Sequence, residues 1–133
     1  MAQDTHHDRD AADRKWFPHA PTFSDVHHEQ VCYHVPGRSP IAGVYKGKRG
    51  YLRLLDRATA VAEADPAFDL TWNVGDTFEN DRHAVMLATF ALTVKGRQLR
   101  SGVVVVLDYK DGKVHDVWLV PTDLIAIDAM LLA

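Results

Sequence analysis

The sequence has little of what marks secreted, membrane-spanning and nucleic-acid-binding proteins. It has one cysteine, Cys32, so no disulfide can form within the chain, and no Cys/His spacing typical of a zinc site surrounds it. No apolar run approaches the roughly 20 residues that a membrane-spanning helix needs. Basic residues number 15 against 18 acidic ones, which disfavours a phosphate backbone as the partner. We therefore expect a cytoplasmic protein with no nucleic-acid or membrane partner.

The composition is that of an ordinary globular protein. With 133 residues, 47% of them hydrophobic and 25% charged, the chain is long enough for one domain with a buried core. Residues 1–13 are rich in His and Asp and contain no apolar stretch, so they predict a flexible polar tail rather than a signal peptide. We expect a single domain over residues 14–133.

The first part of the chain predicts short elements and then one long helix. Ala11–Phe17 fits a short helix, and Ser24 or Asp25 fits the N-cap of a helical turn that runs to about His28. Extended segments follow at Val31–Val35 and Gly43–Lys46. From Lys48 to Asp65 the apolar residues have the spacing of one helix face, formed by Tyr51, Leu54, Leu55, Ala58, Val61 and Ala62.

The second half of the chain has the period of two that is typical of strands. Strands are predicted at Phe68–Val74, Ala84–Val94, Gly102–Leu107 and Val114–Val120. Gly75–Arg82 predicts a polar turn region, and Asp123–Leu132 predicts a final short helix. The two middle strands are apolar on nearly every residue, so both sheet faces must be covered. Helices on one face and a second copy of the chain on the other satisfy this, and we expect a homodimer.

Two segments resemble a known family. The run from His34 to Gly47, HVPGRSPIAGVYKG, is similar to the HxPGxSPxAGxYxG motif of SnoaL-like proteins. These belong to the nuclear transport factor 2-like (NTF2-like) superfamily, together with ketosteroid isomerase and limonene epoxide hydrolase. Lys110–Val114, followed by Trp118 and Asp123, is similar to the end of the family's sequences. The resemblance covers residues 31–133.

The resemblance implies a fold and leaves the activity open. It implies an α+β domain in which a cone-shaped, curved and mostly antiparallel sheet wraps around helices and encloses an apolar pocket. It also implies dimerisation through the outer sheet face. The superfamily includes isomerases, cyclases, hydrolases and proteins without known chemistry, so the fold by itself does not determine the function.

His34 is the candidate general acid or base. It lies nine residues before Gly43, where the resemblance puts the catalytic aspartate of ketosteroid isomerase, and an imidazole titrates near neutral pH. The alternative is a histidine that only hydrogen-bonds the next loop and shapes the pocket. Asp123 is a candidate for orienting His34 in a dyad, although its preceding Thr122 and following apolar run favour an N-cap of the final helix.

The sequence departs from its relatives where they carry catalytic carboxylates. The aspartic acid of ketosteroid isomerase should fall within Val103–Val106, and the Arg-x-Asp pair of limonene epoxide hydrolase within Ala84–Val94. The second aspartate of the hydrolase, and the base of the polyketide cyclase, correspond to Val120. None of these positions is charged. Steroid isomerisation and epoxide hydrolysis by the usual mechanisms are therefore disfavoured.

The expected ligand is a small apolar, cyclic molecule. The candidate lining residues are large rings and apolar strand residues: Trp16, Tyr33, Trp72, Val104, Trp118 and Val120. Two functions stay open, namely proton-transfer chemistry with His34 (isomerisation, cyclisation or dehydration) and a non-catalytic ligand-binding or dimerisation module. No cofactor is implied. No metal is expected either, because the adjacent His27 and His28 lack a chelating spacing.

Overall fold

The structure is a computed structural model that describes residues 27–132. The expected polar tail and the expected helix at Ala11–Phe17 lie outside these residues. The described elements are, in chain order, β1 (His27–Val35), β2 (Gly43–Lys46), α3 (Gly47–Glu63), β3 (Asp69–Glu79), β4 (His83–Val94), β5 (Arg97–Lys110), β6 (Lys113–Pro121) and α4 (Leu124–Leu132). Neither described helix is long and apolar enough to cross a membrane.

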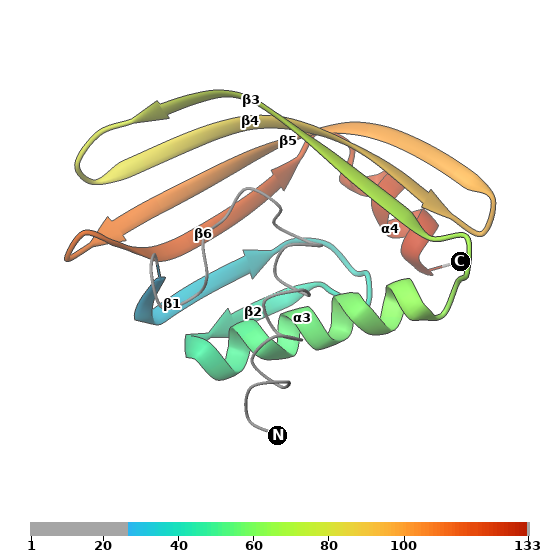
Figure 1. Ribbon diagram of the computed structural model, residues 1–133, viewed down its shortest axis with the longest axis horizontal. Helices are drawn as coiled ribbons and strands as arrows, with labels where there is room; N and C mark the ends of the chain where they lie inside the picture. Colours follow the sequence, from blue (N-terminus) through green and yellow to red (C-terminus); the bar gives the residue numbers. More distant parts are fainter. Residues whose placement is uncertain (1–26, 133) are drawn as a thin grey trace.

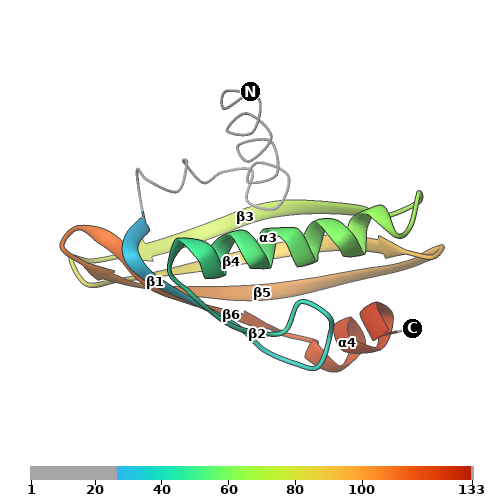
Figure 2. The same ribbon diagram turned by 90° about the horizontal axis from the view of Figure 1, so that it is seen from below.

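The strands form one curved sheet that bends around the helices. Its order is β2-β1-β6-β5-β4-β3, with β1 and β6 parallel and the other neighbours antiparallel. Figure 1 shows the sheet arching from β3 over to β2, with α3 and α4 on its concave side. Figure 2, seen from below, shows α3 in front of the strands and running along the sheet. The α+β fold with a curved, mostly antiparallel sheet around helices is confirmed.

Helix α3 buries the apolar stripe that the sequence predicts. Its buried residues are Gly50, Tyr51, Leu54, Leu55, Ala58 and Ala62. Within one cluster, Tyr51 and the two leucines pack against Val31, Tyr33 and Val35 of β1. Burying each such large side chain contributes about 1.5–3 kcal/mol. A Cβ at Gly50 would lie 2.6 Å from the carbonyl carbon of Tyr45, so the helix approaches β2 closely enough that glycine is needed.

Two local predictions, a helical turn and a polar turn region, are wrong because strands β1 and β3 occupy residues that the sequence assigns to them. The helical turn to about His28 does not reach that residue, because His27 and His28 begin β1. The polar turn region at Gly75–Arg82 is also shorter, since β3 continues to Glu79. The register of β3 against β4 shifts between Val74 and Thr77. The glycine at 75 therefore marks an irregularity inside a strand, which sequence alone reads as a turn.

Alternation along the strands gives the sheet an inner and an outer face. The inner face is buried against α4 through the cluster Ala88, Phe90, Leu92, Val94, Val103 and Met130. On the outer face Phe78, Leu87 and Val120 remain 60%, 40% and 50% exposed. The central strands are thus apolar on both faces, and the two described helices, α3 and α4, cover only one of them.

Candidate functional site

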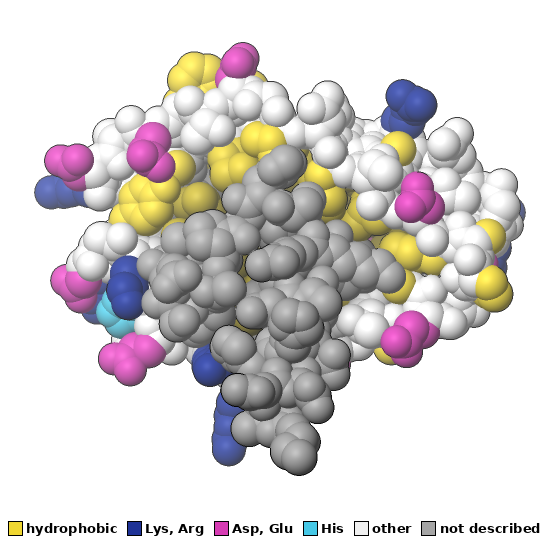
Figure 3. Space-filling view, in the orientation of Figure 1, with side chains coloured by type: hydrophobic (Ala, Val, Ile, Leu, Met, Phe, Trp, Pro, Cys, Tyr) yellow, Lys and Arg dark blue, Asp and Glu magenta, His cyan; other side chains and the backbone are white. Residues whose placement is uncertain are grey.

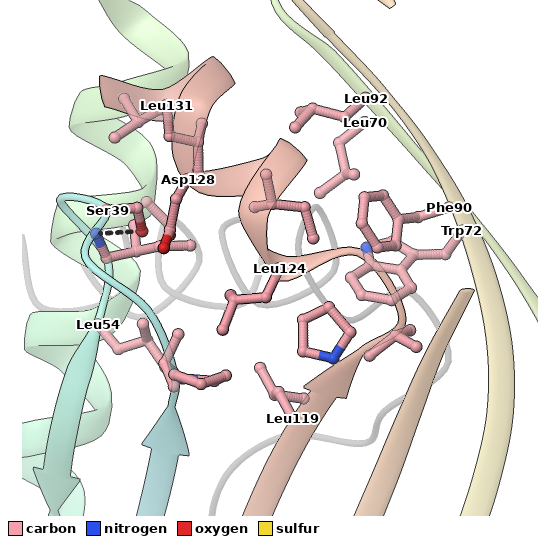
Figure 4. A pocket seen from close by; sticks show the side chains of 18 of the residues that line it. Ser39, Leu54, Leu70, Trp72, Phe90, Leu92, Leu119, Leu124, Asp128 and Leu131 are labelled. Carbon is pink, nitrogen blue, oxygen red and sulfur yellow. Dashed lines mark hydrogen bonds between the residues drawn. The ribbon is translucent and has the colours of Figure 1, made fainter. Parts of the chain in front are cut away.

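A pocket lies on the inner face of the sheet, between α3 and α4. It has a volume of about 130 Å³, and its described lining is apolar except for the side chains of Ser39, Asp128 and the indole nitrogen of Trp72. Figure 4 shows Trp72 and Phe90 on the strand side, with Leu124 and Asp128 reaching in from α4. On the face seen in Figure 3, hydrophobic side chains gather in the band between the upper strands and α3. The hollow suits an apolar guest.

Trp72 is the aromatic anchor of the pocket. It faces Phe90 across the β3–β4 pair, and the two ring centroids lie 5.4 Å apart with the planes tilted by 51°. Its indole nitrogen, Nε1, is buried and has no hydrogen-bond partner among residues 27–132. Buried donors are nearly always paired in proteins, so this N–H, which lacks a partner among the described residues, is a candidate donor to a group outside them.

Asp128 places a carboxylate in the wall of the pocket. Its Oδ2 accepts a hydrogen bond of 3.0 Å from the backbone N–H of Arg38, while Oδ1 is buried without a partner. Gly37 permits this approach: its φ is +101°, and a Cβ there would lie 2.5 Å from Oδ1. Asp128 therefore ties the loop after β1 to α4. The sequence analysis missed it, although an acidic residue inside an apolar helical segment was the available signal.

The expected lining residues occupy different positions in the structure. Trp72 lines the pocket. Tyr33 is buried instead against Tyr51 of α3, with ring centroids 5.2 Å apart, and Trp16 lies outside the described residues. Three other expected lining residues, Val104, Trp118 and Val120, do not line the pocket. A residue next to each of them does so instead, namely Val103, Leu119 and Pro121. Strand alternation puts Val104, Trp118 and Val120 on the outer face.

The expectation that His34 lies at the pocket wall is wrong, because the next residue, Val35, lies there instead. The ring of His34 lies on the outer face. There it stacks on Trp118, with centroids 4.8 Å apart and planes 5° from parallel. Its Nε2 lies 3.2 Å from Oδ1 of Asp116. The side chain is 31% exposed, so it is partly open to solvent and separated from the pocket by the sheet.

Asp123 caps α4 and is not the carboxylate beside His34. Its Oδ1 accepts a hydrogen bond of 3.2 Å from the backbone N–H of Ala126. Asp116 takes the place beside His34 that a dyad would need. The parallel pairing of β1 with β6 brings these two residues together. That pairing joins strands distant in sequence, and no local pattern predicts it.

Neighbouring groups on the outer face shift the pKa values of Asp116 and Cys32. Burial alone would raise the pKa of Asp116, but hydrogen bonds to His115 and His34 outweigh it and hold the pKa below its usual range. Burial raises the pKa of the Cys32 thiol, with Asp116 adding to the rise and Lys46 opposing it. The thiol is therefore no activated nucleophile on its own.

Known structures share this fold at low sequence identity. No family model matches the chain, and no curated protein matches it significantly. Bal32a, from a soil-derived mobile gene cassette, aligns with a TM-score of 0.71 at 22% identity over 98% of this chain and 95% of that one. An NTF2-like protein of unknown function from Burkholderia pseudomallei aligns with a TM-score of 0.66 at 16% identity over 100% of both chains.

A further similar structure contains a small molecule. TerC, co-crystallised with polyporic acid, aligns with a TM-score of 0.67 at 18% identity over 80% of this chain and 81% of that one. Identities at this level show the fold alone. The fold is NTF2-like, as the resemblance in the sequence implied.

Proposed function

We propose that the protein binds a small apolar molecule of about one ring, carrying a carbonyl or hydroxyl oxygen, in the pocket between α4 and the inner sheet face. The observation that carries the proposal is Nε1 of Trp72, which is buried without a partner among the described residues, in a wall that is apolar apart from Ser39 and Asp128. The volume of about 130 Å³ is close to the engineered cavity of about 150 Å³ that binds benzene. Co-crystallisation of the similarly folded TerC with polyporic acid supports a cyclic guest.

The expected affinity is modest. Burying about 150 Å² of ring surface at about 25 cal/mol per Å² contributes about 4 kcal/mol. A hydrogen bond from Trp72 to the ligand oxygen adds about 1 kcal/mol. Before the cost of association is subtracted, these gains correspond to a dissociation constant of about 0.2 mM, so we expect an affinity in the millimolar range. Ligand-detected NMR or calorimetry at millimolar ligand is therefore the suitable measurement.

A matched pair of tryptophan variants tests the proposal. Trp72→Phe keeps an aromatic ring in the pocket and removes the N–H, so the affinity for phenol or cyclohexenone should fall about fivefold towards that for benzene. Trp118→Phe, on the outer face, should leave the affinity unchanged. Wild-type protein that binds no ring compound at millimolar concentration would contradict the proposal, and so would equal losses in the two variants.

Proton transfer on the bound molecule is a second candidate function. Among the described lining residues, Asp128 is the one with a carboxylate, and such a group can exchange a proton with a ligand. We assign this role to Asp128 rather than to His34 or Asp123, because His34 lies on the other side of the sheet and Asp123 caps α4. Asp128→Asn should abolish conversion of any ligand found to turn over while keeping its binding. Unchanged conversion would remove Asp128 from the mechanism.

We also propose that two copies pair through the outer sheet face. Phe78, Leu87 and Val120 form an exposed apolar patch there, on β3, β4 and β6. Exposed apolar patches on soluble domains commonly mark interaction surfaces. A second copy presents the same patch, which satisfies the requirement for self-complementarity in a two-fold dimer.

A further inference from the structure

The outer face carries a second polar site, at its β1 end. Cys32 and His34 alternate on β1, and pairing with β6 sets Asp116 opposite Cys32. The thiol sulfur, a ring nitrogen of His34 and a carboxylate oxygen of Asp116 all lie within 4.8 Å of one another. We propose that these three side chains bind one Zn²⁺ or similar borderline transition-metal ion per chain.

The donor set selects the class of metal. Sulfur, imidazole nitrogen and carboxylate oxygen are the ligands of protein zinc sites, whereas Ca²⁺ and Mg²⁺ prefer oxygen alone. With metal–ligand bonds of about 2.0–2.3 Å, donors in a tetrahedral site lie about 3.3–3.7 Å apart. The pair formed by His34 Nε2 and Asp116 Oδ1, at 3.2 Å, is already that close. The sulfur lies within 4.8 Å of both of these donors, so binding the ion requires only that the three groups draw closer together.

Neighbouring residues hold two of the ligands in orientation. His115 Nδ1 lies 2.7 Å from Oδ2 of Asp116, which leaves Oδ1 for the metal. The stacked ring of Trp118 fixes the plane of the His34 imidazole. Supporting contacts of this kind are typical of metal sites. A β-bulge explains why His115 reaches Asp116 from the next position, since the β5–β6 register shifts between Asp108 and Tyr109.

The site is open to solvent on one side. The side chains of His34 and Asp116 are 31% and 22% exposed, so an ion can enter without unfolding. Three protein ligands leave one tetrahedral position for water or another small ligand. Lys46, opposite Cys32 on β2, is the nearby cation, and its exposed chain can turn towards solvent. The pocket lies on the other face, so failure of the pocket proposal leaves this one standing.

Cobalt is the appropriate reporter, because Co²⁺ bound to a thiolate gives a charge-transfer band in the near ultraviolet. Cys32 is the single cysteine of the chain, so the band can come from no other residue. We expect one Co²⁺ per chain and displacement of the cobalt by Zn²⁺. Cys32→Ser should abolish the band, and circular dichroism verifies that this variant is folded. His115→Ala should keep the band but weaken Co²⁺ binding about 10- to 100-fold.

A second His–Asp pair on the same face provides the matched control. His83 Nε2 lies 3.1 Å from Oδ1 of Asp108, which faces Asp116 across the β5–β6 pair, but neither His83 nor Asp108 belongs to the group formed by Cys32, His34 and Asp116. His34→Ala should weaken Co²⁺ binding at least tenfold, whereas His83→Ala should leave it unchanged. The proposal is overturned if folded wild-type protein shows no charge-transfer band at millimolar Co²⁺. Equal losses in the two alanine variants, or one ion for every two chains, would overturn it as well.

Discussion

At the scale of the residue, neighbouring positions on β1 face two different surroundings, an apolar pocket and a polar cluster on the outer face. Val35 points into an apolar pocket, and His34, one residue earlier, meets Asp116 and Trp118 on the opposite face. Gly37, two positions further on, allows the loop to lie against Asp128. The backbone of β1 therefore separates the inner pocket from the polar group of Cys32, His34 and Asp116 on the outer face.

Gly37→Ala should destabilise the protein more than Gly96→Ala. Both glycines have a positive φ, +101° and +78°, so each substitution costs about 1–2 kcal/mol of backbone strain. A Cβ at Gly37 also meets the carboxylate of Asp128 at 2.5 Å, whereas one at Gly96 meets nothing within 4 Å. Urea unfolding of the two variants measures the difference. Equal losses of unfolding free energy would show that the contact with Asp128 is unimportant.

Tyr109 should titrate at unusually high pH. Burial and a hydrogen bond of 2.7 Å to Glu79 raise its pKa to about 12. Because the folded state holds this proton more tightly than the unfolded state, the associated stability is present below about pH 10 and is lost as the pH rises towards 12. Ultraviolet titration should show a late tyrosinate step that Tyr109→Phe removes and Glu79→Gln moves to lower pH. A step unmoved by Glu79→Gln would contradict the role of that carboxylate.

At the scale of the element, the long helix α3 was predictable from the sequence, but the inner and outer faces of the central strands β4 and β5 were not. The stripe on α3 has one apolar and one polar side, so its pattern determines which side is buried. β4 and β5 are apolar on both sides, and their pattern therefore cannot distinguish Val103 from Val104. In β1 the alternation of Val31, Tyr33 and Val35 with Cys32 and His34 does favour the observed buried face, and the expectation of His34 at the pocket wall comes from the family resemblance instead. Asp116 and Asp128 enter their sites through contacts between distant segments, which a single sequence does not reveal.

The start of α4 depends on its cap. Asp123→Ala removes the acceptor for the Ala126 N–H and should lower the free energy of unfolding by about 0.5–2 kcal/mol. Asp123→Asn keeps an acceptor oxygen and should lose much less. Chemical denaturation of both variants measures these changes. If the asparagine variant is as unstable as the alanine variant, the charge of Asp123 rather than its hydrogen bond is what matters.

At the scale of the whole molecule, the two faces of the one curved sheet differ in what they carry. Its concave side holds the helices and the pocket, as Figures 1 and 4 show. Its outer side presents the apolar patch of Phe78, Leu87 and Val120, with the polar site of Cys32, His34 and Asp116 at the β1 end. Residues 27–132, the part of the chain that the structure describes, cover only the first of these surfaces.

The apolar patch of Phe78, Leu87 and Val120 predicts that the protein forms a dimer, and a substitution that introduces one charge there should disrupt it. Phe78→Asp should shift the protein from dimer to monomer at micromolar concentration, because it buries a charge in the apolar interface. Ile125→Asp provides the control, since Ile125 is 86% exposed but lies on α4, away from the outer face. Sedimentation equilibrium distinguishes the two variants. A wild-type protein that is monomeric at this concentration would contradict the dimer.

The central claim, that the inner pocket binds a small ring through the Trp72 N–H, is tested most directly by a crystal structure of the protein soaked with phenol. We expect the ring between Trp72 and Leu124, with its oxygen about 3 Å from Nε1. Density for phenol only on the outer face, or a pocket closed by side chains in the soaked crystal, would contradict the claim.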